Sequence, residues 1–324
     1  MELENFAITG VSALGLITLL KWLICFICWV WKMFLRPPKN LKEYGSWAMI
    51  TGPTAGIGKA LAFEVASKGL NLVLVGRNPS KLEETSREIQ EKFNKVGHDH
   101  RVQVKNVVLD LAKSSGKEIA DVIGKETEGL DVGVVINNAG LSYPCPRFFD
   151  EVDSELMESM MRVNMEAVTW ITWSVLPRMI KKKKGAIVNI GSVSTVVTSS
   201  FPLYTIYAAT KSYLAMLSRC ISLEYKQSGI DIQTQIPVFV ATEMTKLKAT
   251  TFLIASPETY SKASIRSIGY EHLCAPYWSH SMQWAILNML PDALINRCLF
   301  SYLVGINKRA KVKEAQKSKM LQQQ

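Results

Sequence analysis

The sequence is short of cysteine. Six cysteines are spread over 324 residues with no repeated spacing: Cys25, Cys28, Cys145, Cys220, Cys274 and Cys298. So few thiols exclude a disulfide-stapled scaffold and favour a reducing compartment. Cys25 and Cys28 lie inside an apolar run, where we expect sulfur facing lipid rather than a metal or redox pair.

Signatures of metal and nucleic-acid binding are also missing. His98 and His100 flank Asp99, but no further ligand lies near them in the sequence, so we expect a polar loop rather than a metal site. No array of basic and aromatic residues indicates nucleic-acid binding. Acidic residues are outnumbered, 28 Asp and Glu against 38 Lys and Arg, which gives a net charge of +10. This excess suits an anionic membrane face or a polyanionic small molecule.

One long hydrophobic run stands at the N-terminus. Between Phe6 and Leu35 the only charged residues are Lys21 and Lys32. The window Val11–Trp31 would be about 31 Å long as a helix, which matches the hydrocarbon core of a bilayer. Near the middle of a membrane helix, Lys21 makes the free energy of insertion less favourable by about 2.5–3.5 kcal/mol. Each surrounding Leu, Ile, Val or Phe makes it more favourable by about 0.3–0.6 kcal/mol. The run therefore predicts a transmembrane helix.

The charges that flank this run indicate its orientation. Glu2 and Glu4 precede it, and basic residues follow it: Lys32, Arg36, Lys39 and Lys42. Because basic flanks stay on the cytoplasmic side, we expect the rest of the chain in the cytosol. A cleaved signal peptide fits less well, because the run is long, begins with acidic residues and lacks a small-residue cleavage site.

After Pro37-Pro38, apolar strands alternate with helices. Strands are expected at 47–51, 70–75, 102–109, 132–136, 186–190 and 230–238, and helices at 57–68, 79–96, 115–128, 153–183 and 205–228. This alternation predicts an α/β fold with a parallel sheet that is covered by helices on both faces. Beyond Val240 the pattern weakens.

A glycine-rich turn follows the first strand: Thr51-Gly52-Pro53-Thr54-Ala55-Gly56-Ile57-Gly58. Its glycines permit a sharp turn, close approach to a pyrophosphate, and packing of the next helix, whose N-terminus attracts anions. The turn indicates dinucleotide binding, although a plain tight turn would look the same. Arg77, after the second strand, favours a 2′-phosphate and so NADP(H), with an ordinary surface arginine as the alternative.

Tyr207 and Lys211 lie one helical turn apart. A phenol near pKa 10 is a poor acid–base group at neutral pH, and a nearby cation lowers that pKa. The pair suits proton delivery to a carbonyl oxygen that receives hydride, but this spacing also occurs by chance in many helices. Ser192 closes the fifth strand at the edge where such sheets bind ligands, and it can donate a hydrogen bond to the same oxygen.

Together these motifs resemble the short-chain dehydrogenase/reductase family over about residues 46–243, with Asn137-Asn138-Ala139-Gly140 and Asn164 as further matching pieces. The resemblance implies a Rossmann-like doubly wound parallel sheet and the cofactor NADP(H). It implies Tyr207 as proton donor, Lys211 as the group that lowers its pKa, Ser192 as carbonyl ligand and Asn164 as support for a water relay to Lys211. It also implies cofactor contacts from Gly52, Thr54, Gly56, Ile57, Gly58, Arg77, Asp110, Asn137, Ala139, Gly140, Tyr207, Lys211 and Thr242.

Two departures from the family pattern bear on the site. Ser192 lies two residues farther from Tyr207 than the family's commonest spacing, which would select Ser194, but the strand end favours Ser192. Where the family has Pro-Gly after the sixth strand, this chain has Pro237-Val238.

A narrower resemblance runs nearly end to end. The anchor, Arg36-Pro37-x-Lys39-Asn40-Leu41 and Val240-Ala241-Thr242-Glu243-Met244 look like the microsomal, plant-type very-long-chain 3-oxoacyl-CoA reductases. This implies NADPH-dependent reduction of 3-oxoacyl-CoA in fatty-acid elongation at the endoplasmic reticulum, with long-chain acyl-CoA and membrane lipid as partners. Binding to other elongase subunits and formation of a homodimer are left open by the sequence. The alternatives are a membrane-bound steroid 17-ketone or other lipid ketone reductase, and a cofactor-binding scaffold with weak activity.

These inferences divide the chain into an anchor at 1–35, a linker at 36–45, a catalytic domain at 46–305 and a basic tail at 306–324. Residues 272–304 are apolar in pieces but are broken by Pro291 and Asp292. We expect them to form a substrate lid or membrane-dipping segment rather than a second span. Lys308–Lys319 should be mobile, and Lys181–Lys184 should be a solvated helix end rather than a clamp for CoA.

Overall fold

The computed structural model describes residues 2–94, 101–195, 198–247 and 250–322, so His98, Asp99 and His100 lie outside the described residues. The chain forms two compact units, residues 1–38 and 39–324. The first is helix α1 (Glu2–Val30), extended by the π-helical turn η1 (Trp31–Leu35). In the described part of the chain, Glu4–Leu35 is the one helix that by itself is long and apolar enough to cross a membrane, with a mean hydropathy of 2.2.

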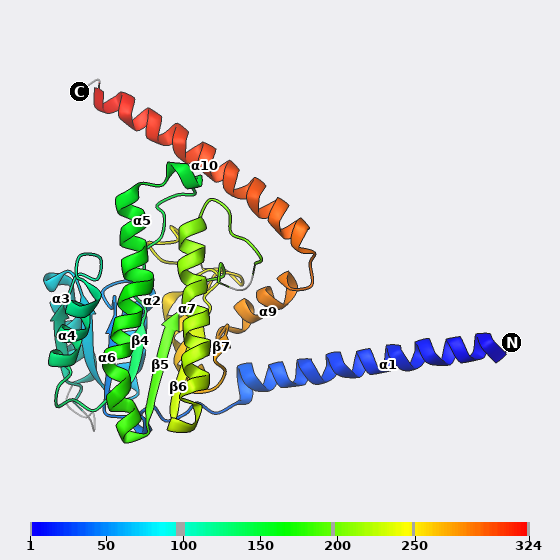
Figure 1. Ribbon diagram of the computed structural model, residues 1–324, viewed down its shortest axis with the longest axis horizontal. Helices are drawn as coiled ribbons and strands as arrows, with labels where there is room; N and C mark the ends of the chain where they lie inside the picture. The colour runs from blue at the N-terminus through cyan, green and yellow to red at the C-terminus, as the bar shows by residue number, and fades with distance from the viewer. Residues whose placement is uncertain (1, 95–100, 196–197, 248–249, 323–324) are drawn as a thin grey trace. The chain divides into compact units, whose positions relative to one another are not determined.

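The second unit is built on a parallel sheet (Figure 1). Its strands are β1 (Trp47–Thr51), β2 (Asn71–Gly76), β3 (Val104–Val108), β4 (Val132–Asn137), β5 (Gly185–Ile190), β6 (Ile230–Gln235) and β7 (Leu273–Cys274). Over the ranges that the structure describes, the sheet has seven strands, all parallel, in the order β3-β2-β1-β4-β5-β6-β7. The order reverses direction between β1 and β4, so the doubly wound prediction is confirmed. β3 and β6 are shorter than expected.

Alternate residues along the strands enter two cores, one on each face of the sheet. On one face, Ile50 and Leu74 share a core with residues of α2 (Gly56–Ser67), α3 (Pro79–Phe93) and α8 (Pro257–Ser267). On the other, Met49 and Val73 share a core with residues of α4 (Gly116–Glu126), α6 (Ala167–Lys182) and α7 (Thr205–Glu224). Full burial of each such side chain stabilises the folded state by about 1.5–3 kcal/mol. Burial on both faces explains why the strands read as continuous apolar runs.

The helix expected over 153–183 is present but is not uniform. α5 (Ser154–Met161) continues through the π-helical turn η4 (Arg162–Glu166) into α6. Asn164 lies in this turn and is fully buried. A π turn inside an α-helix often accompanies a functional site, because it shifts the direction of side chains on the helix.

The C-terminal part differs from the expected mobile tail. α9 (Trp278–Leu287) and α10 (Asp292–Gln322) meet at a bend of 114°, so they could form only a broken span or re-entrant pair. α10 crosses the expected boundary at residue 305. Asn307 donates to the carbonyl oxygen of Pro146 at 2.8 Å, and Lys311 pairs at 2.5 Å with Glu151 in η3 (Phe149–Glu151). Asn307 and Lys311 therefore join α10 to a segment far away in the sequence.

The expected linker belongs to the second unit from Lys39 onward. Leu41, in the turn η2 (Leu41–Glu43), and Tyr44 are buried in its core. Lys182 donates to the carbonyl oxygen of Tyr44 at 2.8 Å and pairs with Asp131 at 2.6 Å. Lys182 is therefore a packing element, and the expectation of a solvated lysine run was wrong at this position.

Candidate active site

The carboxyl ends of the strands bring the expected site residues to one edge of the sheet. Gly52 follows β1, Arg77 follows β2, Asp110 lies beyond β3, Ala139 lies beyond β4 and Ser192 lies beyond β5. Parallel strands end at a common edge, and this is the edge at which open α/β sheets bind ligands.

The glycine turn between β1 and α2 is shaped for close approach of backbone groups. Gly56 has φ +53°, in the left-handed region that favours glycine. A methyl group on Gly58 would overlap the carbonyl oxygen of Gly52 and the amide of Asn138. The N-cap residue Ala55 offers no side-chain hydrogen bond to the first turn of α2, so no cap side chain competes with an anion there. This geometry fits a pyrophosphate.

The remaining residues of the turn have different roles. Thr54 is half-buried in the turn itself. Ile57 packs against core residues, so its side chain serves the core. Thr242 reaches the turn from the loop after β6: a Cβ on Gly56 would come within 3.1 Å of the Thr242 methyl group. Gly56 and Thr242, which are both expected to contact the cofactor, are thus brought together.

The end of β4 is tied to the glycine turn by Asn138 and not by Asn137. Asn138 Nδ2 donates to the carbonyl oxygens of Thr51 and Gly52 at 3.0 and 3.1 Å. Thr51 Oγ1 accepts from the backbone N–H groups of Asn138 and Ala139, both at 3.0 Å. Asn137 is buried and donates to Asn189 Oδ1 in β5 at 2.8 Å, which braces two strands. Sequence reasoning missed Asn138 and Thr51, although both stand in the matched motifs.

Tyr207 lies near the start of α7, and the side chain of Ser192 acts on its phenol in the direction that lowers the pKa. Ser192 Oγ accepts from the backbone N–H of Ser194 at 3.3 Å and from its hydroxyl at 3.1 Å. Ser192 is therefore the serine that acts on the phenol, and Ser194 acts through its hydrogen bonds to Ser192. Burial raises the pKa of Tyr207, and Ser192 acts in the opposite direction.

Lys211 is buried one turn farther along α7. Its Nζ lies 6.0 Å from the centroid of the Tyr207 ring and donates to the carbonyl oxygen of Ile190 at 2.9 Å. Burial lowers the pKa of Lys211 to about 8. We expected Lys211 to lower the pKa of Tyr207, but that pKa is raised because burial outweighs the opposing effect of Ser192. A raised pKa keeps the phenol protonated, which is the form that donates a proton.

Asn164 holds three segments together beside Lys211. Its side chain accepts from the backbone N–H of Leu141 at 2.8 Å and donates to Leu141 O at 2.9 Å and Thr210 Oγ1 at 3.0 Å. A Cβ on Gly140 would come within 3.2 Å of Lys211 Nζ and 3.4 Å of Asn164 Oδ1. The loop after β4, the π-helical turn and α7 therefore converge at the lysine. A water relay from Asn164 to Lys211 stays a prediction.

Two positioning residues escaped the sequence reasoning. Tyr143 Oη accepts from the backbone N–H of Ile206 at 3.2 Å, next to Tyr207, and so caps the first turn of α7. The buried His280 of α9 accepts at Nδ1 from the Val238 N–H at 3.4 Å and donates from Nε2 to Phe239 O at 3.0 Å. Burial lowers the pKa of His280 to about 4, so the imidazole is neutral. It holds the loop in which Val238 replaces the family's glycine. Neither residue carries a local motif that sequence reasoning could have used.

Arg77 and Asp110 lie at the outer strand ends. Arg77 is exposed and has no hydrogen bond or ion pair with the residues that the structure describes. Its guanidinium is thus available to a phosphate. Asp110 Oδ1 accepts from the backbone N–H of Ala112 at 3.0 Å, which fixes the turn after β3.

Comparison with known proteins agrees with this geometry. The short chain dehydrogenase family profile matches residues 46–251. A very-long-chain 3-oxoacyl-CoA reductase-like protein of Arabidopsis thaliana is 43% identical over 314 residues, 95% of this chain and 97% of that protein. The very-long-chain 3-oxoacyl-CoA reductase of Homo sapiens is 36% identical over 250 residues, 76% of each chain. A solved short-chain dehydrogenase from Sphingobium yanoikuyae in complex with NADPH is 28% identical, with a TM-score of 0.62 over 77% of this chain and 95% of that one.

The matched stretch contains the strands β1 to β6, the glycine turn, Ser192 and the Tyr207–Lys211 turn. The same stretch supplies the residues that meet at the carboxyl edge of the sheet. The chain therefore belongs to the short-chain dehydrogenase/reductase family of oxidoreductases.

Proposed function

We propose that the protein reduces very-long-chain 3-oxoacyl-CoA to 3-hydroxyacyl-CoA with NADPH, as a step of fatty-acid elongation. The observation that carries this proposal is the 43% identity, along nearly the whole chain, to a very-long-chain 3-oxoacyl-CoA reductase-like protein. The grouping of Tyr207, Ser192 and Lys211 around the start of α7 supports it.

The residues at the sheet edge fit NADPH. The glycine turn and the N-terminus of α2 would hold the pyrophosphate, and Arg77 would pair with the 2′-phosphate. Asp110 would lie near the adenine, Lys211 would hold the nicotinamide ribose, and Ala139 and Gly140 would line the cofactor. When bound, the nicotinamide supplies a hydride to the substrate's carbonyl carbon.

The chain's own groups would supply the proton and hold the oxygen. Tyr207 donates its phenolic proton to the carbonyl oxygen, and Ser192 donates a hydrogen bond to the same oxygen. The Lys211 ammonium, held by Ile190 O, stabilises the phenolate that remains on Tyr207. Hydride at carbon and proton at oxygen complete the alcohol. We also propose that Asn164 supports return of a proton to Lys211 through water.

A membrane location suits such a substrate. Each CH₂ of an acyl chain gains about 0.8 kcal/mol on leaving water, so very long thioesters concentrate in membranes. We propose that α1 anchors the protein in the endoplasmic reticulum membrane with its catalytic domain in the cytosol, where NADPH is available. Other elongation enzymes in the same membrane would then be its partners.

The test uses the full chain in neutral detergent. NADPH oxidation is measured with a long-chain 3-oxoacyl-CoA for the wild type, Tyr207→Phe and the control Tyr225→Phe, which lies just beyond the end of α7. We expect Tyr207→Phe to lose at least about 1,000-fold in kcat while it still binds NADPH, and Tyr225→Phe to be unaffected. An active Tyr207→Phe enzyme would refute the proposed proton donor.

The same assay separates the alternatives. We expect a higher kcat/KM for the acyl-CoA than for a steroid 17-ketone, because specificity is the ratio of these constants. A steroid ketone that is turned over faster than any acyl-CoA would replace the proposed substrate. NADPH binding without turnover of either, together with rescue of an elongation-reductase deletion by Tyr207→Phe, would identify a scaffold instead.

A further inference from the structure

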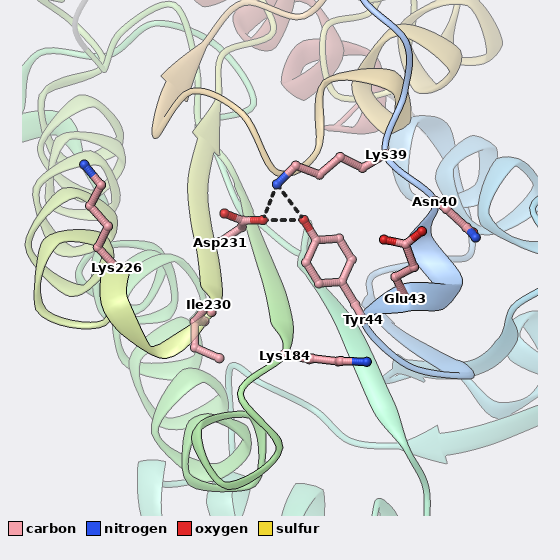
Figure 2. Close-up of a pocket in the computed structure, with 9 residues that line it drawn as sticks. Lys39, Asn40, Glu43, Tyr44, Lys184, Lys226, Ile230 and Asp231 are labelled. Atoms are coloured by element: carbon pink, nitrogen blue, oxygen red, sulfur yellow. Dashed lines mark hydrogen bonds and ion pairs between the residues drawn. The ribbon is translucent and has the colours of Figure 1, made fainter.

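A cavity of about 760 Å³ opens at the amino-terminal edge of the sheet, opposite the edge that carries Tyr207 (Figure 2). It lies beside the first residues of β5 and β6 and the turn η2. The residues used below are Lys39, Glu43, Tyr44, Lys184, Lys226, Ile230 and Asp231. No step of the proposed reaction uses this cavity.

One wall of the cavity is organised by an ion pair and a phenol. Lys39 Nζ lies 2.8 Å from Asp231 Oδ2 and 3.3 Å from the Tyr44 hydroxyl. The Tyr44 hydroxyl donates to the same Asp231 carboxylate (Figure 2). Burial and the neighbouring Asp231 raise the pKa of Tyr44, so its hydroxyl keeps the proton that it donates. Lys39 therefore neutralises the Asp231 carboxylate at this wall.

Three lysines line the cavity, Lys39, Lys184 and Lys226, against two carboxylates, Asp231 and Glu43, so positive charge is in excess. Lys184, just before β5, and Lys226, in the turn η5 (Lys226–Ser228), are exposed. Within the described ranges, neither ammonium group has a side-chain hydrogen bond or ion pair, although Lys184 helps to lower the pKa of Asp131, which pairs with Lys182 at 2.6 Å. The Ile230 side chain and the Tyr44 ring add apolar lining. Two ammonium groups beside apolar lining suit a phosphate that carries an apolar body.

The short connection between the apolar helix and Lys39 favours a membrane lipid as the source of that phosphate. Lys39 follows Leu35, the last residue of the apolar helix, by four residues, and so lies within about 14 Å of it. If that helix spans the membrane, the connection limits Lys39 to about 14 Å from the end of the span, a distance that can reach the headgroup layer, about 5–7 Å thick. The CoA phosphates fit less well, because β5 and β6 place this cavity about 20 Å from the Tyr207 edge.

We propose that this cavity binds the phosphate headgroup of an anionic membrane phospholipid. The site goes beyond the proposed reductase activity and does not depend on it, although it rests on the proposed membrane span. Lys184 and Lys226 are the phosphate-binding groups, and the Lys39–Asp231–Tyr44 wall fixes the shape of the cavity.

The test uses the full chain in neutral detergent, titrated with dioctanoyl phosphatidic acid and followed by native mass spectrometry. The variant Lys184→Gln/Lys226→Gln removes both proposed contacts. The control Lys117→Gln/Lys125→Gln removes the same charge from exposed positions on α4. Dioctanoyl phosphatidylcholine and inorganic phosphate are titrated in parallel, and NADPH binding checks that each variant is folded.

We expect one saturable phosphatidic acid site in the wild type and the control. At about 1 kcal/mol for each lysine, the cavity variant should bind about 5- to 30-fold more weakly. Equal affinity in the cavity and control variants would overturn the proposal. Inorganic phosphate that binds as tightly as phosphatidic acid would also overturn it, because the site would then recognise a free anion rather than a lipid. Loss of NADPH oxidation would have no bearing on either outcome.

Discussion

The ammonium of Lys211 lies 6.0 Å from the centre of the Tyr207 ring, and no acidic group in the described part of the chain contributes to the pKa of either. Burial is the largest influence on both groups: it raises the pKa of the phenol, against an opposing effect of Ser192, and it lowers the pKa of the lysine to about 8. A buried cation with one carbonyl partner costs stability, which is the kind of strain that an anionic ligand at the same edge would relieve.

This cost makes a stability prediction for Lys211→Met in the cofactor-free protein. The folded pKa of about 8 lies below the ordinary 10.5, so between these values the unfolded chain binds more protons. Wild-type stability should therefore rise as pH increases through this window. At pH 7 we expect Lys211→Met to be more stable by about 1–3 kcal/mol, with the gap closing toward pH 10.5. Denaturation in detergent at several pH values measures this.

The exposed Lys226→Met provides the matched control for the Lys211 measurement. Its stability should follow that of the wild type at each pH. A Lys211→Met protein that is less stable than the wild type at pH 7 would mean that the hydrogen bond to Ile190 O outweighs the cost of burial.

Ser192 and Ser194 should differ sharply in kinetics. Ser192 acts on the Tyr207 phenol, while Ser194 donates to Ser192 and stands one step farther away. Loss of a hydrogen bond to a reacting oxygen costs about 100- to 1,000-fold in kcat, so we expect that loss for Ser192→Ala. Ser194→Ala should lose less than about tenfold. Steady-state kinetics of the two variants measure these losses. A larger loss of kcat in Ser194→Ala than in Ser192→Ala would assign the carbonyl-binding role to Ser194.

Arg77 should set cofactor preference. Its exposed guanidinium follows β2, where a 2′-phosphate would lie. A charge-assisted hydrogen bond is worth about 1.5–3 kcal/mol, so Arg77→Ala should raise the KM for NADPH about 10- to 100-fold. NADH, which lacks the phosphate, is the internal control and should respond little. An equal rise in KM for NADPH and NADH would show that Arg77 does not contact the 2′-phosphate.

His280 should make the fold sensitive to acid. Its folded pKa of about 4 lies below the ordinary 6.5, so the unfolded chain takes up a proton first as pH falls. Stability should therefore be full above pH 6.5 and decline by about 1–3 kcal/mol toward pH 4. His280→Gln keeps a donor and an acceptor but does not titrate, and it should flatten this decline. His272→Gln, at an exposed position, should leave the wild-type profile unchanged.

The parallel sheet could be predicted from the sequence because both faces of every central strand are buried. Continuous apolar runs such as those of β1 and β2 predict a parallel sheet whatever covers it. The glycine turn and the Tyr207–Lys211 pair were found for a similar reason. Each lies within a single turn, where spacing along the chain equals proximity in space.

Residues whose role depends on a distant partner were harder to assign. Asn137 and Asn138 are adjacent, and only the pairing of β4 with β5 decides which one faces Asn189 and which one holds Thr51. His280 lies in an apolar stretch with no local sign that it holds Val238. The docked C-terminal helix depends on contacts of Asn307 and Lys311 with residues more than 150 positions away.

The sequence by itself determined the long apolar N-terminal helix, the alternating α/β plan and the motifs of the short-chain dehydrogenase family, since these follow from hydrophobic patterning and short spacings. Only the tertiary structure decided the direction of the Tyr207 pKa shift, the hydrogen bonds from Ser194 to Ser192, and the cavity beside Lys39. These depend on burial and on hydrogen bonds, which exist only after the chain has packed.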